Sequence, residues 1–379
     1  MSEYEILRLI WWAVLGVLLI GVAVMDGFDL GSAMLLPFVG RTDMERRVVI
    51  NTVGPVWEGN QVWLITGGGA IFAAWPALYA VAFSGFYLAM FLLLVSLILR
   101  PVGFKFRSKV EDTRWRNVWD GALFVGGLVP ALVFGVAFGN ALLGAPFRFT
   151  DDLRMVYAGN LLGLFTPFAL LCGLVSVAML AMHGAAWLSC KTEAPVGNRA
   201  RRIGAMAALT TVALFAIGGL WASQLNGYVI THFAGVDGPS NPLLKQVARV
   251  PGALMHQYGE HPIAMVVPAL GLLGAALSGL LMARGAAPKL AFLCSGGAIA
   301  GIIGTAGVSL FPFLLPSSLD PAAGLTVWDA SSSPTTLMVM TVATVLLLPI
   351  ILLYTSFIYH VLRGKVTEAA IAEDPHANY

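Results

Sequence analysis

Nine apolar stretches run through this chain, most of them long enough to cross the hydrocarbon core of a bilayer. A helix needs about 20 apolar residues to cross about 30 Å of hydrocarbon, whereas a membrane-spanning strand would alternate apolar and polar residues. These stretches are continuously apolar, so they predict helices. We expect transmembrane helices at about 8–36, 50–73, 77–99, 119–143, 157–188, 203–225, 262–283, 290–314 and 335–362.

The composition agrees with a membrane protein. Of the 379 residues, 58% are hydrophobic and 11% are charged, whereas a soluble domain carries about 25% charged residues. The chain shows no long linker, low-complexity tract or internal repeat. We therefore expect residues 1–379 to form a single all-α, polytopic transmembrane domain. The net charge of +2 gives no reason to expect a nucleic-acid partner.

The second stretch is the most polar, because it contains Pro55, Glu58, Asn60 and Gln61, and it could instead be an extramembrane loop. Basic residues argue for nine helices, since Lys and Arg gather in cytoplasmic loops. With nine helices, an outer amino terminus and a cytoplasmic carboxyl terminus, the basic loops 41–47, 100–116, 191–202, 284–289 and 363–365 share the cytoplasmic side. The exceptions are Arg8, Arg148, Arg154, Lys245 and Arg249.

Few ionisable side chains fall within the predicted helices, and each is a functional candidate because its burial costs free energy. Asp26 and Asp29 are three residues apart, which places both carboxylates on one face of the first helix. Glu58 lies in the second helix. Such carboxylates can relay protons if water or a partner lies beside them. The alternative is that they cap helices or pair with polar groups at a helix interface.

The histidines bear on cofactors, because membrane haem is commonly held by axial side chains that face the bundle interior. His183 and His360 lie near predicted cytoplasmic helix ends, and none of the six lies in the middle of a predicted helix. We therefore expect no haem ligand in this chain. The remaining histidines are His232, His256, His261 and His376. The 42 glycines favour close helix packing, within the chain or against another subunit.

Eight short motifs follow one another from residue 7 to residue 332, and Glu-Gly-Asn-Gln-Val-Trp within 57–63 is the most specific of them. Together they resemble the second subunit of cytochrome bd quinol oxidases. The motifs lie at 7–12, 26–31, 45–47, 57–63, 83–87, 100–104, 114–117 and 328–332.

The resemblance implies a subunit that is not catalytic alone, in a complex that oxidises quinol and reduces oxygen in the bacterial cytoplasmic (inner) membrane. It implies a partner, subunit I, that carries haems b and d, whereas this chain ligates none. Subunit II would support subunit I and contribute to oxygen access and cytoplasmic proton delivery. Small accessory subunits, membrane lipids and, in some members, a structural quinone complete the expected partners.

Residue by residue, Asp29 and Glu58 match acidic positions of the family's proton path, with Asp26 a further candidate, and Trp63 matches a position beside the oxygen route. Lys109 and Asp120 match polar positions near the cytoplasmic side. Two positions depart from related sequences, because Glu58 and Lys105 stand where those sequences can carry Asp. The longer side chain and the reversed charge alter the expected route for proton uptake.

Two other functions are compatible with the same features. A purely structural scaffold would explain the small-residue seams without any transfer path. A secondary transporter would explain polar residues at membrane depth, and it would move a solute in liposomes without a haem-bearing partner.

Overall fold

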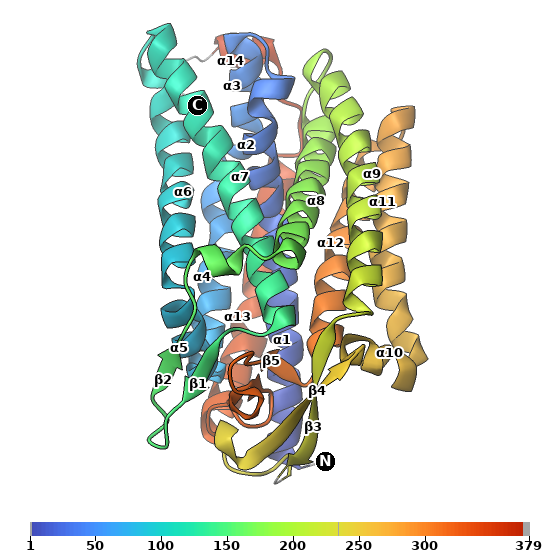
Figure 1. Ribbon diagram of the computed structural model, residues 1–379. Coiled ribbons are helices and arrows are strands. Elements are labelled where there is room, and N and C mark those ends of the chain that lie inside the picture. The colour runs from blue at the N-terminus through green and yellow to red at the C-terminus, as the bar shows by residue number, and fades with distance from the viewer. Residues whose placement is uncertain (1, 234, 374–379) are drawn as a thin grey trace.

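The computed structural model describes residues 2–233 and 235–373, which form a bundle of long helices with short antiparallel hairpins at one end (Figure 1). The helices are α1 (Glu3–Met25), α2 (Gly27–Val39), α3 (Asp43–Val53), α4 (Trp57–Ala74), α5 (Pro76–Gly85), α6 (Tyr87–Phe106), α7 (Thr113–Leu143), α8 (Pro167–Lys191), α9 (Val196–Ala222), α10 (His256–Glu260), α11 (Val266–Arg284), α12 (Pro288–Leu310), α13 (Pro334–Val361) and α14 (Glu368–Glu373). The strands are β1 (Phe147–Phe149), β2 (Met155–Tyr157), β3 (Asn226–Phe233), β4 (Lys245–Pro251), β5 (Phe313–Leu315) and β6 (Leu325–Thr326).

The bundle has two distinct ends. One end, here called the hairpin end, holds the amino terminus and the pairs β1–β2, β3–β4 and β5–β6 (Figure 1). The opposite end, here called the basic end, holds α3, α14 and the loops at 41–47, 107–116, 191–202, 284–289 and 363–365. The expected gathering of basic loops at one end of the molecule is therefore present in the fold, but the predicted 100–116 loop begins later, because Arg100 and Lys105 lie within α6.

Eight helical segments of the described residues are long and apolar enough to cross a membrane, with α1 and α2 counted as one segment. The fourth helix, α4, is not among them because its first turn is polar, yet it runs along the bundle and packs on α1 (Figure 1). The amino terminus and α14 lie at opposite ends, which requires an odd number of passes, and α4 supplies the additional one. Nine membrane crossings and the orientation of the termini stay predictions.

Helix boundaries differ from the predicted ones where proline intervenes. The predicted second helix at 50–73 is divided into α3 and α4 around Pro55, since proline lacks the backbone N–H that a continuous helix needs. The predicted helix at 157–188 begins ten residues late, because Thr166 caps α8 with Pro167 at its first position. The apolar residues before Thr166 instead form β2 and a short 3-10 turn.

At the hairpin end, the β3–β4 hairpin is followed by α10. Within the bundle, α2 lies between α7 and α8 and is buried along most of its length. Gly31 of α2 meets Gly184 of α8 so closely that a Cβ on Gly31 would lie 2.8 Å from the Gly184 Cα. This close contact of small residues holds α2, and with it the two acidic positions, in the centre of the bundle.

Candidate functional site

Asp26 lies at the junction of α1 and α2, where it forms a buried ion pair with Arg100 of α6. The Arg100 Nη1 and Nη2 atoms donate to the two carboxylate oxygens at 2.8 and 2.9 Å. Both side chains are almost completely buried. Gly126 of α7 leaves room for the arginine, because a Cβ there would lie 3.0 Å from the Arg100 Cγ. Planar guanidinium and carboxylate groups match in this two-bond arrangement, so Asp26 is held as a charged structural partner.

Asp29 lies one turn further along α2, and its partners are neutral. Its Oδ2 accepts a hydrogen bond from Asn60 Nδ2 of α4 at 2.9 Å. The Asn60 Oδ1 in turn accepts one from the Tyr359 hydroxyl of α13 at 2.7 Å. The other carboxylate oxygen, Asp29 Oδ1, is buried and has no hydrogen-bond partner among the described residues. We call Asp29, Asn60 and Tyr359 the Asp29 chain.

The two acidic positions therefore differ in what they can do. Both Nη atoms of Arg100 are used by Asp26, and the described residues place no cation of its own against Asp29. A buried charge without a counter-ion is costly, whereas a neutral carboxylic acid is tolerated where its hydrogen-bonding groups are satisfied. Protonation of Asp26 would disrupt its salt bridge with Arg100, whereas protonation of Asp29 would disrupt no salt bridge that the structure shows.

Glu58 lies in a helix, as the sequence predicts, but the burial expected for an ionisable side chain in a transmembrane helix is wrong for it. The side chain lies in the first turn of α4 and is 64% exposed, where it pairs with the 53% exposed Lys105 of α6 at 3.0 Å. The physical reason is that α4 starts at Trp57, so its first turn lies near the basic end, where a helix N-terminus favours an acidic side chain. Its match to a proton-path position stays untested.

Asp120 and Lys109 lie near the basic end but in different surroundings. The buried Asp120 of α7 accepts hydrogen bonds from Arg107 Nε at 2.5 Å and from Arg46 Nη1 at 2.7 Å. It therefore ties α7 to the end of α6 and to α3. Lys109 is exposed at the end of the 3-10 turn that follows α6. Neither residue is joined to the Asp29 chain by a hydrogen bond that the structure shows.

Trp63 lies on α4, half-buried against α1. Gly21 makes this contact possible, because a Cβ there would lie 2.5 Å from the Trp63 Cε3 atom. The indole fills the space between α1 and α4 on the side of the bundle toward the hairpin end, where it packs on a cluster of buried apolar residues. The bulk of Trp63 therefore controls how much free space remains at this seam.

Comparison with known proteins decides the family. Residues 7–362 match the family described as cytochrome bd terminal oxidase subunit II. The chain belongs to this family. It is a multi-pass membrane subunit of a terminal oxidase complex.

Two curated relatives of this subunit II span nearly all of its length. The cytochrome bd-I ubiquinol oxidase subunit 2 of Escherichia coli (strain K12) is 50% identical over 380 residues, which cover 100% of both chains. The cytochrome bd ubiquinol oxidase subunit 2 of Bacillus subtilis (strain 168) is 32% identical over 361 residues, which cover 94% of this chain and 96% of that protein.

A solved structure, titled as the bd oxidase from Geobacillus thermodenitrificans, contains a chain of the same fold. The two chains superpose with a TM-score of 0.67 at 17% sequence identity, covering 94% of this chain and 98% of that chain. The polytopic helical bundle expected from the sequence is thereby confirmed.

His183 is a buried polar residue of this subunit II that the sequence placed near a helix end. Its ring lies in the core, where Nδ1 is 2.7 Å from Ser295 Oγ and Nε2 is 2.9 Å from the Val24 carbonyl oxygen. The ring also stacks on Phe292 with centroids 4.6 Å apart. The adjacent Gly184 lies at the close contact with α2. A glycine next to His183 is the feature of the sequence that could have indicated that His183 is buried. Both ring nitrogens are engaged within the chain.

No group of three or more His, Cys, Asp or Glu side chains is positioned to hold a metal ion within residues 2–233 and 235–373. His376 lies outside the described residues. Which subunit of the complex holds haem stays a prediction.

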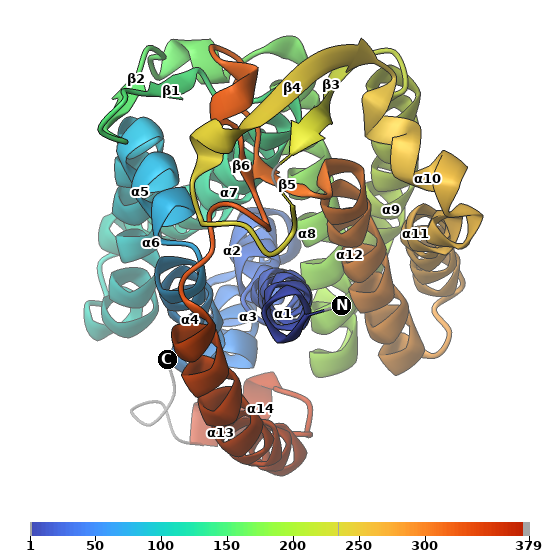
Figure 2. The same ribbon diagram turned by 90° about the horizontal axis from the view of Figure 1, so that it is seen from below.

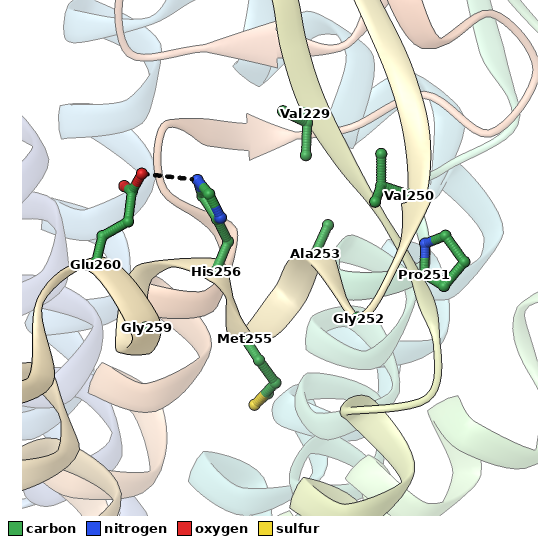
Figure 3. A pocket seen from close by; sticks show the side chains of 9 residues that line it. All are labelled: Val229, Val250, Pro251, Gly252, Ala253, Met255, His256, Gly259 and Glu260. Carbon is green, nitrogen blue, oxygen red and sulfur yellow. Dashed lines mark ion pairs between the residues drawn. The ribbon is translucent and has the colours of Figure 1, made fainter.

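One cavity of about 310 Å³ lies at the hairpin end, beside the base of β3–β4 (Figure 3). Its walls are mostly apolar, and its polar side chains are the ion pair between His256 Nε2 and Glu260 Oε1 at 3.1 Å. Both members of this pair are more than half exposed, so water shares their hydrogen bonds. This cavity is remote in sequence from the Asp29 chain, and the described residues give it no buried acid or base.

Proposed function

We propose that this subunit II ligates no haem, supports a subunit I that carries haems b and d, and delivers protons from the cytoplasm while leaving a path for oxygen. The complex would oxidise quinol and reduce oxygen in the bacterial cytoplasmic (inner) membrane. The observation that carries the proposal is the Asp29 chain. A fully buried carboxyl group with neutral partners is suited to proton exchange, and it lies in the core of a chain from an oxidase family.

The partner face is the second element of the proposal. Leu337 is the single buried residue of α13, which stands at the edge of the bundle beside α4 (Figure 2). We call eight of the exposed apolar residues of these two helices the α4–α13 face, and we assign it to subunit I. They are Val62, Ile65, Phe72, Val342, Leu346, Ile350, Leu353 and Phe357.

One feature favours a protein rather than lipid on this face. Gly68 and Gly69 of α4 have open space where their side chains would be, and small residues let a neighbouring membrane helix approach closely. Tyr359 brings this face into contact with Asp29 through Asn60.

For oxygen, the proposal rests on the seam between α1 and α4. Trp63 fills that seam against Gly21, so replacement by a smaller side chain would widen it. Trp63→Leu should change the oxygen affinity of the complex and leave the pH dependence of turnover unaltered. An unchanged oxygen affinity would remove Trp63 from the oxygen route.

The proton function is tested in the intact complex purified through subunit I. Asp29→Asn keeps the size and hydrogen bonding of the side chain while removing the exchangeable proton. Turnover of quinol with oxygen should fall while the haem spectrum and subunit stoichiometry stay as in the wild type. Wild-type turnover of Asp29→Asn across the pH range would refute the proton role.

A structural scaffold remains the second candidate function, and the close packing of Gly31 against Gly184 favours it. A scaffold subunit would lose haem and partner together when Asp29 is changed. The same purification therefore separates the two functions, because it records turnover, haem content and stoichiometry on one sample.

A further inference from the structure

The hydrogen bonds of the Asp29 chain have a fixed direction. Asn60 Oδ1 carries no hydrogen, so the Tyr359 hydroxyl must donate to it. The Asn60 Nδ2 group then faces Asp29 and donates to Oδ2. This order requires an acceptor at Asp29 Oδ2, which an ionised carboxylate provides.

Protonation of Asp29 adds a donor to the Asp29 chain, and this donor needs an acceptor. If the proton resides on Oδ1, the new O–H lies buried where the described residues offer it no acceptor. If it resides on Oδ2, that atom and Asn60 Nδ2 become two facing donors. Rotation of the Asn60 amide by about half a turn resolves the second case, because Asp29 O–H then donates to Asn60 Oδ1 and Asn60 Nδ2 donates to the Tyr359 oxygen. No other proton of Asp29, Asn60 or Tyr359 has to leave its atom. The half-buried Tyr359 hydroxyl then becomes free to donate to another group.

We propose that Asn60 is a hydrogen-bond switch that reports the protonation state of Asp29 to Tyr359 on α13. The inference rests on the proposed role of Asp29 in proton delivery and adds two positioning residues to it. A side-chain amide has a donor group and an acceptor group at equal reach, so one rotation exchanges them without moving the backbone. A Leu at this position could form neither hydrogen bond.

The other charged groups near Asp29 are already committed. Asp26 and Arg100 are joined by two hydrogen bonds, and His183 on the neighbouring α8 bonds to Ser295 and Val24. Asp120 on the neighbouring α7 is held by Arg46 and Arg107. The Asn60 amide is therefore the polar group through which a proton at Asp29 is sensed.

The position of Tyr359 connects the switch to the proposed α4–α13 face. It lies on α13, which packs mainly on α1 and α4 and contributes most of the proposed α4–α13 face. A tyrosine hydroxyl that changes from donor to acceptor at Asn60 alters the polar contacts offered at the edge of that face. The partner subunit would thus respond to the charge of Asp29, which lies deep in α2.

The test is infrared difference spectroscopy of the intact oxidase complex between high and low pH. In the wild type we expect a carboxylic acid carbonyl signal at low pH, lost in Asp29→Asn, together with a tyrosine ring signal, lost in Tyr359→Phe. In Asn60→Leu, which has nearly the same shape but no amide, the carboxyl signal should remain and the tyrosine signal should disappear. The matched control is Tyr354→Phe, whose exposed ring lies on the same helix and should leave both signals in place.

A tyrosine signal that persists in Asn60→Leu would overturn the switch while leaving the proton role intact. A carboxyl signal that is unchanged in Asp29→Asn would instead show that the proposed proton role fails. If Asn60→Leu does not assemble, Tyr359→Phe decides the question, because an amide released from Tyr359 should shift the pH midpoint of the Asp29 carboxyl signal. An unshifted midpoint contradicts the switch.

Discussion

Two regions of the molecule bury carboxylates in opposite ways. At the hairpin end, Asp329 forms an ion pair with Lys245 of β4 at 2.7 Å, and both side chains are almost fully buried. Its other oxygen, Oδ1, accepts a hydrogen bond from the Thr326 backbone N–H. In the centre of the bundle, Asp29 is equally buried but bonds to the neutral Asn60. The first carboxylate is bonded to a counter-ion, and the second is bonded to none among the described residues.

The comparison separates structural charges from exchangeable ones. Burial lowers the pKa of Lys245, and the neighbouring Asp329 carboxylate opposes that shift. The free-energy cost of charging the buried Lys245 is thus partly offset by Asp329. The pair also connects β4 to the segment before α13. Asp29 forms no ion pair among the described residues, and the proposed function assigns the exchangeable proton to it. A buried pair is expected to act on stability, and Asp29 is expected to act on rate.

The largest expected effect is on the hairpin end. Lys245→Met leaves Asp329 buried without a counter-ion, which should cost about 3–5 kcal/mol of unfolding free energy. Thermal unfolding of the complex and proteolysis at the β3–β4 hairpin measure it. The double variant Lys245→Met with Asp329→Asn should recover most of the loss because no lone charge stays buried. Lys289→Met, at an exposed lysine, should change stability by about 0.5 kcal/mol or less.

If the double variant is as unstable as the single one, the pair is not what determines stability at that end. The Lys245–Asp329 pair would then no longer serve as the structural counterpart of Asp29.

The second effect is on turnover. Asp29→Asn should reduce quinol oxidation by about tenfold to a hundredfold, since proton transfer by a positioned group is worth about that much or more. Its matched variant is Asp26→Asn, three residues away, which leaves Arg100 buried without its counter-ion and should lower assembled complex rather than turnover per haem. Equal turnover per haem in the two variants would contradict the division of roles.

Part of this division was predictable from the sequence. The spacing of Asp26 and Asp29 predicted that they share a helix face, and both are buried. Their different roles were not predictable, because Arg100, Asn60 and Tyr359 come from three other helices and their contacts depend on how those helices pack.

The fold divides in the same way. Apolar length predicted the long helices, since a membrane span is defined by local composition. The hairpin end was harder, because the apolar residues at 155–165 resemble a helix in composition, and Thr166 with Pro167 was the overlooked sign that α8 starts later. The Lys245–Asp329 pair joins residues 84 positions apart, which no local pattern indicates.

The third effect is a pH-dependent stability at the basic end. Glu45 caps α3 and pairs with Arg199 of α9 at 2.5 Å. Burial alone would raise the pKa of Glu45, but hydrogen bonds from Arg199 and from the backbone N–H groups of Arg41 and Thr42 lower it overall. A carboxyl group whose pKa is lower in the folded than in the unfolded protein stabilises the fold at pH values above its unfolded-state pKa. This stabilisation is lost as the pH falls through the folded-state pKa.

Glu45→Gln should therefore cost about 1 kcal/mol at neutral pH, and the difference from wild type should shrink as the pH falls below about 4. Melting of the complex at several pH values measures it. Asp43→Asn, in the same helical turn but 42% exposed, should cost less. A loss that grows on acidification would show that Glu45 is not held as a stabilising carboxylate.

The smallest expected effect is at Glu58, and it is the sharpest check on the comparison. Glu58 and Lys105 are both more than half exposed, and exposed pairs contribute about 0.2–1 kcal/mol. Glu58→Gln should therefore have little effect on stability and leave turnover close to the wild-type value, well above that of Asp29→Asn. The charge-swapped variant, Glu58→Lys with Lys105→Glu, should restore the wild-type rate if the pair acts only by its mutual attraction. A loss in Glu58→Gln as large as that in Asp29→Asn, without rescue by the swap, would mean that Glu58 itself passes protons. Absence of a counter-ion would then no longer distinguish the exchangeable carboxyl groups, because Glu58 has one in Lys105.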